Sequence, residues 1–153
     1  VVGNNNLLME GMHVGHDVII KNYCILGNAT KLAGEVEIDD CAILSSTVLV
    51  HQFCHIGSYV MVSGGTRTSQ DIPPFVIAGR EPVAYCGLNI VGLRRRGFAP
   101  EVIDNIHNAY RIIYGGSGLM KARLQQVRDE VPACPEVDYI ISFFEASSRG
   151  VIK

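Results

Sequence analysis

Two short segments contain the residues that are best suited to chemistry. The first, MHVGHD at positions 12–17, contains His13, His16 and Asp17. Histidine is the natural general base near neutral pH for removing a proton from an alcohol or an amine. Because neighbours on an extended strand point to opposite faces, Asp17 can reach His16 only if the chain turns between them. The alternative interpretation is a polar surface turn that carries two histidines.

A six-residue repeat defines the elements that must position these residues. Branched aliphatic residues occupy every sixth position without a break: Val2, Leu8, Val14, Ile20, Leu26, Leu32, Ile38, Leu44, Val50, Ile56 and Val62. This period fits neither a helix nor an alternating strand, but it is typical of short strands joined by turns. Three such segments close a triangular coil of about 18 residues, and coils stack at about 4.8 Å. The sequence therefore predicts a mainly β fold, a parallel β-helix, whose hand the period does not determine. Four residues after each aliphatic, small or β-branched residues from Val18 to Thr66 suit a tight inward corner.

The second segment, VHQFCHI at positions 50–56, contains His51, Gln52 and His55. Val50 stands 36 positions after Val14, so this segment should lie on the same face two coils away, roughly 10 Å along the axis. A zinc site made by His51, His55 and a histidine of a neighbouring chain is an alternative. Zinc ligands stand about 2 Å from the ion, so His16 is expected to be too distant to join them within one chain. We therefore expect no metal.

Composition is that of an ordinary globular protein. The chain has 153 residues, of which 48% are hydrophobic and 18% charged, and its formal net charge is -2. This balance gives no indication of a nucleic-acid partner, and no apolar run approaches the length of a membrane-spanning helix. The five cysteines lack CxxC spacing, which favours reduced structural thiols and a cytoplasmic location.

The two ends of the repeat predict where the β-helix begins and ends. Val2 already has the type of an interior residue, so we expect further coils before Val1 and hence an N-terminally truncated chain. The period fails at Thr68, and glycines and prolines follow. We expect the β-helix to cover residues 1–74 and an irregular connector to cover 75–99.

Helical spacing begins after the connector and predicts an α-helical C-terminal domain over residues 100–153. Pro100 suits the first turn of a helix, and Gly115-Gly116 would end it. Further amphipathic helices are expected to begin near Ser117 and near Pro135.

Several longer strings narrow the interpretation from a fold to a family. MHVGHD, LAGEVEIDD, VHQFCHIG, QDIPPFVIAG and GLNIVGLRRRGF, together with the ending SSRGVIK, resemble a family of hexapeptide-repeat enzymes. These are the acyl-carrier-protein:UDP-N-acetylglucosamine O-acyltransferases, which catalyse the first step of lipid A biosynthesis in Gram-negative bacteria. The resemblance covers essentially the whole chain, and GLRRRGF is far more specific than the hexads. It implies a left-handed β-helix, a homotrimer with active sites between subunits, and a longer N-terminus.

The resemblance also implies roles for single residues. His16 matches the catalytic base, Asp17 the acid that orients it, and Gly34 the glycine whose N–H stabilises the oxyanion. Gly64 matches the position that limits the length of the acyl chain. The residues that it places against substrate are His13, His51, Gln52, Asn89, Arg95 and Arg96. Three positions depart from the family pattern, namely Glu35, Pro82 and Val91, and they concern contacts to the sugar nucleotide.

The implied reaction transfers an (R)-3-hydroxyacyl group from acyl carrier protein to the 3-hydroxyl of UDP-N-acetylglucosamine and needs no cofactor. Two other classes stay open: a related acyltransferase that acts on an amino-sugar nucleotide or uses acetyl-CoA, and a non-catalytic β-helix that only binds. Plainer interpretations of single residues also stay open. Gly34 could be a tight corner, Arg94 to Arg96 a solvated turn, and Gly64 the exit from the last coil.

Overall fold

The computed structural model describes residues 1–153, which form two compact units. The first unit comprises Val1–Asn89 and Ser147–Lys153, and the second comprises Ile90–Ala146. The sequence assigned residues 147–153 to the helical region, whereas they cluster with the first unit. The reason is a backbone bridge between Asp71 and Val151, in which the Asp71 N–H donates to Gly150 O at 2.8 Å.

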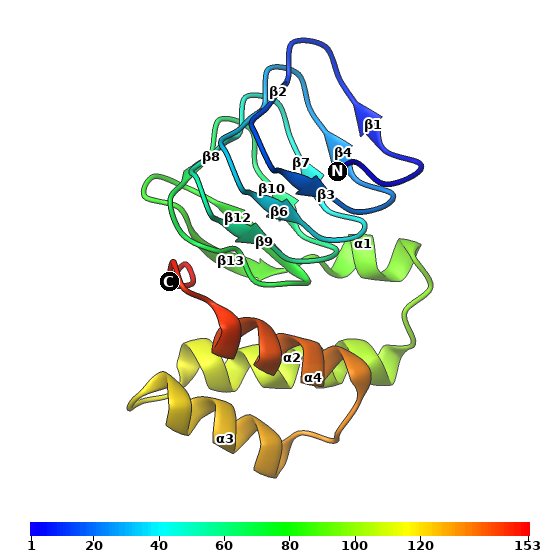
Figure 1. The fold of residues 1–153 in the computed structure, drawn as a ribbon. Helices are drawn as coiled ribbons and strands as arrows, with labels where there is room; N and C mark the ends of the chain where they lie inside the picture. Colours follow the sequence, from blue (N-terminus) through cyan, green and yellow to red (C-terminus); the bar gives the residue numbers. More distant parts are fainter. The chain divides into compact units, whose positions relative to one another are not determined.

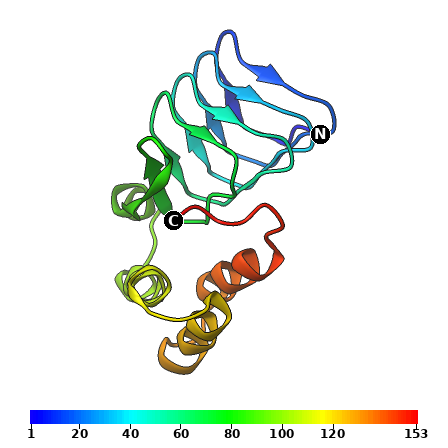
Figure 2. The same ribbon diagram turned by 90° about the vertical axis from the view of Figure 1, so that its left-hand side faces the viewer.

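The first unit is a stack of coils made of two-residue strands (Figures 1 and 2). The strands are β1 (Leu7–Leu8), β2 (His13–Val14), β3 (Ile19–Ile20), β4 (Ile25–Leu26), β5 (Lys31–Leu32), β6 (Glu37–Ile38), β7 (Ile43–Leu44), β8 (Leu49–Val50), β9 (His55–Ile56), β10 (Met61–Val62) and β11 (Arg67–Thr68). They form three faces, in which the strand orders are β1-β4-β7-β10, β11-β8-β5-β2 and β3-β6-β9. Leu8 pairs with Leu26 and Leu26 with Leu44, all in parallel, so the 18-residue coil is confirmed.

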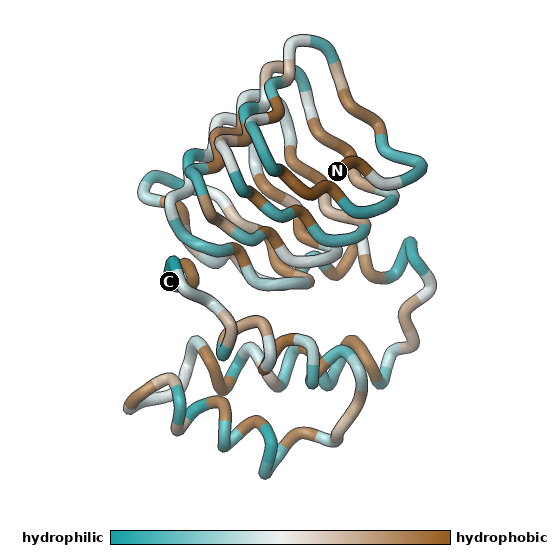
Figure 3. Tube along the Cα trace, in the orientation of Figure 1, coloured by the Kyte–Doolittle hydropathy of each residue, from teal (hydrophilic) through white to brown (hydrophobic).

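The interior of the coils is aliphatic, as the period predicts. Ile20, Leu26 and Leu44 are at most 1% exposed, and hydrophobic residues recur at the same place in successive coils (Figure 3). At the N-terminal end, Val2, Leu8 and Val14 occupy the same positions but are exposed by 50, 41 and 37%. The expected end of the repeat at Thr68 was wrong in one respect. Thr68 pairs with Val50 and is 4% exposed, because threonine is close in shape to valine.

The corners between strands place one residue of each hexad in the left-handed region of backbone conformation. The positive φ angles recur every sixth residue, at Asn5, Gly11, Asp17, Tyr23, Ala29, Glu35, Cys41, Thr47, Phe53, Tyr59 and Gly65. The next residue points inward, as expected from its small or β-branched type. From Val18 to Thr66 the exposure of these inward residues is at most 3%.

Two longer strands follow the last coil. β12 (Val76–Gly79) pairs in parallel with β10, and β13 (Ala84–Leu88) pairs antiparallel with β12. Part of the expected irregular connector therefore extends the first face by two strands.

The second unit contains four helices, α1 (Ile90–Arg95), α2 (Pro100–Gly115), α3 (Met120–Glu130) and α4 (Pro135–Ala146). The helix expected near Ser117 begins at Met120, after Gly118 with a φ of 85°, and Leu119 is 80% exposed. α2 packs against α3 and α4 through a stripe that includes Ile106 and Tyr110. None of the helices is both long and apolar enough to cross a membrane.

Candidate active site

His16 and Asp17 form a hydrogen-bonded pair at the corner after β2. The φ of Asp17 is 57°, so the chain turns between the two residues and brings their side chains to the same side. His16 Nδ1 lies 3.0 Å from Asp17 Oδ2, and the two side chains are 66 and 79% exposed. A carboxylate that accepts the Nδ1 proton leaves the lone pair of Nε2 free to take a proton from another group. The structure thus contains the turn between His16 and Asp17 that their contact requires and that the sequence left open.

Gly34 lies against the His16 ring in the next coil. A Cβ atom at Gly34 would stand 2.4 Å from His16 Nε2 and 2.6 Å from Cε1, closer than real Cβ contacts. The φ of Gly34 is not in the left-handed region, so the need for glycine here is steric and not conformational. The Gly34 N–H has no hydrogen-bond partner in the chain. Gly34, whose backbone N–H is unpaired, therefore lies directly against the His16 ring.

Gln52 continues the same column, since His16, Gly34 and Gln52 are the first corner residues of three successive coils. Glu35, one of the departures from the family pattern, follows Gly34 and donates its backbone N–H to His16 O at 2.8 Å. Ligand atoms of His16, Asp17 and Glu35 lie within 4.8 Å of one another, although all three residues are exposed. They could hold an ion, but nothing else at this corner points to one.

His13 and His51 lie on the face that leads into this corner and line one pocket of about 680 Å³. The pocket is formed by β2, β5, β8 and β11 and by the segment that contains Pro82. The guanidinium of Arg149 lies 3.3 Å from His51 Nδ1, and it also donates to Ser69 O. Arg149 comes from the C-terminal residues 147–153 that belong to this unit.

His55 is directed elsewhere and does not join His51. Its Nε2 lies 2.8 Å from Asp39 Oδ2, on the face made of β3, β6 and β9. Asp39 is 3% exposed and also accepts from Lys21 Nζ at 2.6 Å, while Glu37 lies 3.0 Å from the same ammonium. Ligand atoms of Glu37, Asp39 and His55 are close enough for an ion. The Lys21 ammonium already pairs with both carboxylates of this group, and His55 Nε2 lies against one of them, so a cation is not needed there. The zinc alternative with His51 and His55 finds no support in this arrangement.

Three further predicted residues come from other elements of the chain. Asn89 follows β13, and its side-chain amide donates to Tyr59 O at 3.0 Å. Arg95 ends α1 and Arg96 follows it, both exposed and both in the second unit. The structure therefore brings together His16, Asp17, Gly34 and Gln52 at one corner and His13 and His51 in one pocket.

Gly64 lies at the corner between β10 and β11, where the face that contains β1 meets the face that contains β2. A Cβ there would stand 3.4 Å from Ser46 O and 3.8 Å from Ser45 Cβ, so a side chain could be accommodated. Its expected role in limiting chain length stays a prediction.

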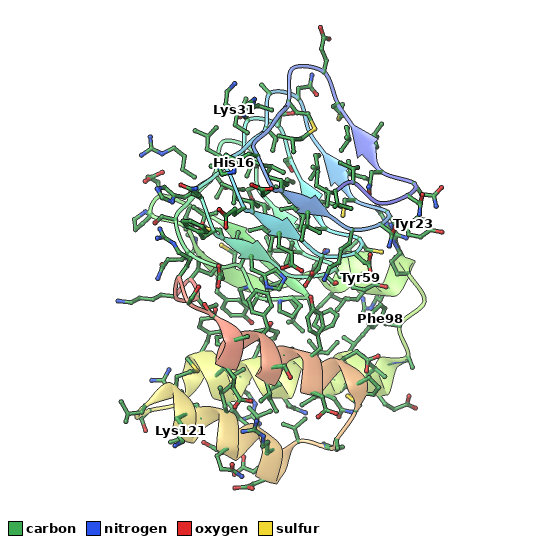
Figure 4. The ribbon with its side chains drawn as sticks, viewed as in Figure 1. His16, Tyr23, Lys31, Tyr59, Phe98 and Lys121 are labelled. Atoms are coloured by element: carbon green, nitrogen blue, oxygen red, sulfur yellow. The ribbon has the colours of Figure 1, made fainter.

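Sequence reasoning missed Arg149 and two lysines, Lys21 and Lys31. Arg149 is 98 positions from His51, and no local pattern indicates such a contact. Lys31 follows His13 by 18 residues, which is one full coil, and both occupy the same position in their hexads. The period could therefore have predicted that the two residues lie side by side. Figure 4 shows Lys31 and His16 on the same side of the stacked coils.

Comparison with known proteins identifies the same family over the whole length of the chain. Residues 71–152 match the family model described as UDP N-acetylglucosamine O-acyltransferase, domain 2. An acyl-[acyl-carrier-protein]–UDP-N-acetylglucosamine O-acyltransferase of Stutzerimonas stutzeri is 41% identical over 152 residues, which are 99% of this chain and 59% of that protein. The chain thus spans about 59% of the length of the curated relatives that it matches.

Solved structures agree with the sequence comparison. The UDP-N-acetylglucosamine acyltransferase of Bacteroides fragilis superposes with a TM-score of 0.96 at 61% identity, covering 97% of this chain and 58% of that one. The Francisella novicida enzyme gives a TM-score of 0.91 at 36% identity, covering 99% and 55%. The parallel β-helix of the first unit is accordingly left-handed, as the resemblance implied. Repeat, corner geometry and family model lead to one conclusion: the chain belongs to the UDP-N-acetylglucosamine O-acyltransferase family.

Proposed function

We propose that the protein transfers an (R)-3-hydroxyacyl group from acyl carrier protein to the 3-hydroxyl of UDP-N-acetylglucosamine, the first step of lipid A biosynthesis. The observation that carries the proposal is the corner at which the His16–Asp17 pair stands against Gly34. A proton acceptor and a residue with an unpaired backbone N–H lie together there, and acyl transfer to an alcohol requires both kinds of group. The names of the relatives supply the substrates.

The proposed reaction needs only groups of the protein and the two substrates. His16 Nε2 takes the proton of the sugar 3-hydroxyl while its oxygen attacks the thioester carbon. The Gly34 N–H donates to the oxyanion of the tetrahedral intermediate. Collapse expels the thiolate of the carrier arm, which takes the proton from the imidazolium. A general base contributes about 10²–10⁴-fold and one oxyanion donor about 10²–10³-fold.

An apolar row on the first face supports a long acyl donor. Leu7, Ile25, Ile43, Met61 and Ile77 pair in register along β1, β4, β7, β10 and β12. They are the outward residues, because each precedes a residue of the interior column or its continuation, such as Leu26 or Leu44. The row spans four strand spacings, roughly 19 Å, over which a hydrocarbon chain could lie. Gly64 follows Met61 by three residues, so it stands near one end of this row.

The same geometry supports a site shared between copies of the chain. In a triangular coil, the corner between two faces is opposite the third face. The His16 corner lies between the β2 and β3 faces, so it is opposite the face that carries the apolar row. A substrate that contacts both must lie between two copies, and closed cyclic assembly of such copies is satisfied by a homotrimer.

The remaining predicted residues have roles in binding under this proposal. His13 and His51 would contact the sugar nucleotide from the pocket, and Gln52 would line the cleft below Gly34. The set assigned to the nucleotide and the pantetheine arm consists of Asn89, Arg95 and Arg96. A cytoplasmic location is also proposed, since the five cysteines form no disulfide and such free thiols are usual in a reducing compartment.

An acyl-transfer assay with the full-length protein tests the proposed function. Purified protein is incubated with UDP-N-acetylglucosamine and either an (R)-3-hydroxyacyl carrier protein or acetyl-CoA, and mass spectrometry identifies the product. The proposal predicts 3-O-acylation from the carrier protein alone. Transfer from acetyl-CoA and none from the carrier protein would contradict it, and so would preference for a UDP-linked amino sugar over the 3-hydroxyl acceptor.

A further inference from the structure

Four outward residues form a single row on the face that leads to His16. His13 pairs with Lys31, Lys31 with Leu49, and Leu49 with Arg67 in the parallel strands β2, β5, β8 and β11. The residues that follow three of them point into the coil and are at most 4% exposed: Leu32, Val50 and Thr68. Since successive side chains of a strand alternate in direction, the four residues of the row point outward, about 4.8 Å apart.

The two strong cations of this row have no anionic partner. Lys31 and Arg67 are exposed, and neither makes an ion pair or a side-chain hydrogen bond in the chain. Lys21, on the neighbouring face, differs because Asp39 and Glu37 lie within 3.0 Å of its ammonium.

The surroundings of the row add little negative charge. The row lines the pocket of about 680 Å³ that also contains His51, and Glu81 is the one carboxylate among the lining residues. The Arg149 guanidinium lies 3.3 Å from His51, which brings another positive charge to the same face. An anionic ligand would therefore find cations that are not already neutralised.

We propose that Lys31 and Arg67 bind a phosphate group of one of the two substrates. The guanidinium presents a fork of donors that matches phosphate oxygens, and the ammonium adds a point charge on a flexible stem. Leu49 between them offers an apolar surface to the uncharged part of the ligand. The identity of the ligand rests on the proposed function, since a phosphate occurs both in the sugar nucleotide and in the arm of the carrier protein.

The position of the pair relative to the reacting groups fits a substrate phosphate. Lys31 precedes Gly34 by three residues, which is about 10 Å along an extended chain. A phosphate held by the row would therefore lie close to the corner without occupying it.

Binding measurements on the full-length protein test this proposal. Isothermal titration gives Kd for UDP-N-acetylglucosamine, 4′-phosphopantetheine and inorganic diphosphate with the wild type and with Lys31→Ala, Arg67→Ala and the double variant. Lys121→Ala removes an exposed lysine of α3 and is the matched control. Lys31→Arg keeps the charge, and circular dichroism checks the fold of each variant.

We expect each alanine variant to raise the Kd of at least one phosphate ligand by about tenfold, the equivalent of one charge-assisted hydrogen bond. A rise in Kd for UDP-N-acetylglucosamine but not for 4′-phosphopantetheine would indicate that the row binds the acceptor substrate. A rise in Kd for 4′-phosphopantetheine alone would indicate that it binds the donor. Unchanged Kd values for all three ligands in the folded double variant would overturn the proposal, as would an equal loss in Lys121→Ala. Diphosphate binding can be measured without any acyl transfer, so it tests the row independently of the proposed function. A protein that binds diphosphate through Lys31 and Arg67 but transfers no acyl group would refute the proposed function alone.

Discussion

Replacing Gly34 with alanine should displace the His16 ring and leave the fold intact. The new Cβ would stand 2.4 Å from His16 Nε2, whereas ordinary contact begins at 3.4 Å, so the ring must move by about 1 Å. A misplacement of about 1 Å can cost about 10²-fold in rate, or about 2.7 kcal/mol of transition-state stabilisation. Gly34 is buried, but its φ is not in the left-handed region and the atoms nearest to the added Cβ all belong to the exposed His16 side chain, so alanine itself strains no backbone.

The assay is kcat for transfer from an (R)-3-hydroxyacyl carrier protein by the full-length enzyme. Gly115→Ala is the matched control, because no atom lies within 4 Å of a Cβ at that position at the end of α2. If Gly34→Ala acts by moving His16, the double variant with His16→Ala should be no slower than His16→Ala alone. A wild-type kcat for Gly34→Ala, or a double variant whose losses multiply, would refute the reasoning.

Three further outcomes follow from the same geometry. Asp17→Asn should lower kcat less than His16→Ala, because it misorients the base without removing it; an equal or larger loss would contradict this. Gly64→Met should shift the preferred donor to a shorter acyl chain while the assembly stays unchanged, and an unaltered preference across donors of different length would exclude the role. Burial alone would lower the pKa of His55, but its hydrogen bond to Asp39 and the nearby carboxylate charges outweigh that effect and raise the pKa above 6.5. In urea unfolding, His55→Gln should therefore cost most stability below about pH 6.5 and progressively less as the pH rises through the raised value, whereas a cost that grows with pH would refute it.

The period of six was sufficient to predict the architecture of the first unit. Ile20 and Leu26 had to be interior residues because no other arrangement keeps a strict six-residue column, and both are buried. The same rule was wrong at Thr68, because it considered only whether a residue is aliphatic and not the shape of its side chain. Handedness needed the family resemblance, because a period carries no chirality.

Local chemistry could be predicted in part. The contact between His16 and Asp17 depended on a turn that the sequence could not determine, and the positive φ of Asp17 supplies it. Arg149 could not be anticipated, because its position beside His51 depends on the return of residues 147–153 to the first unit. The partnership of Lys21 with Asp39 is likewise a contact between coils, 18 residues apart, and it becomes visible only when the outward positions of the period are considered together.

The most direct test of the central claim is kcat of full-length His16→Ala with an (R)-3-hydroxyacyl carrier protein and UDP-N-acetylglucosamine. Light scattering and circular dichroism on the same sample establish that assembly and fold are unchanged. Loss of the general base should lower kcat by at least about 10²-fold. A rate within a few-fold of the wild type, in a correctly assembled protein, would contradict the assignment of His16 as the base.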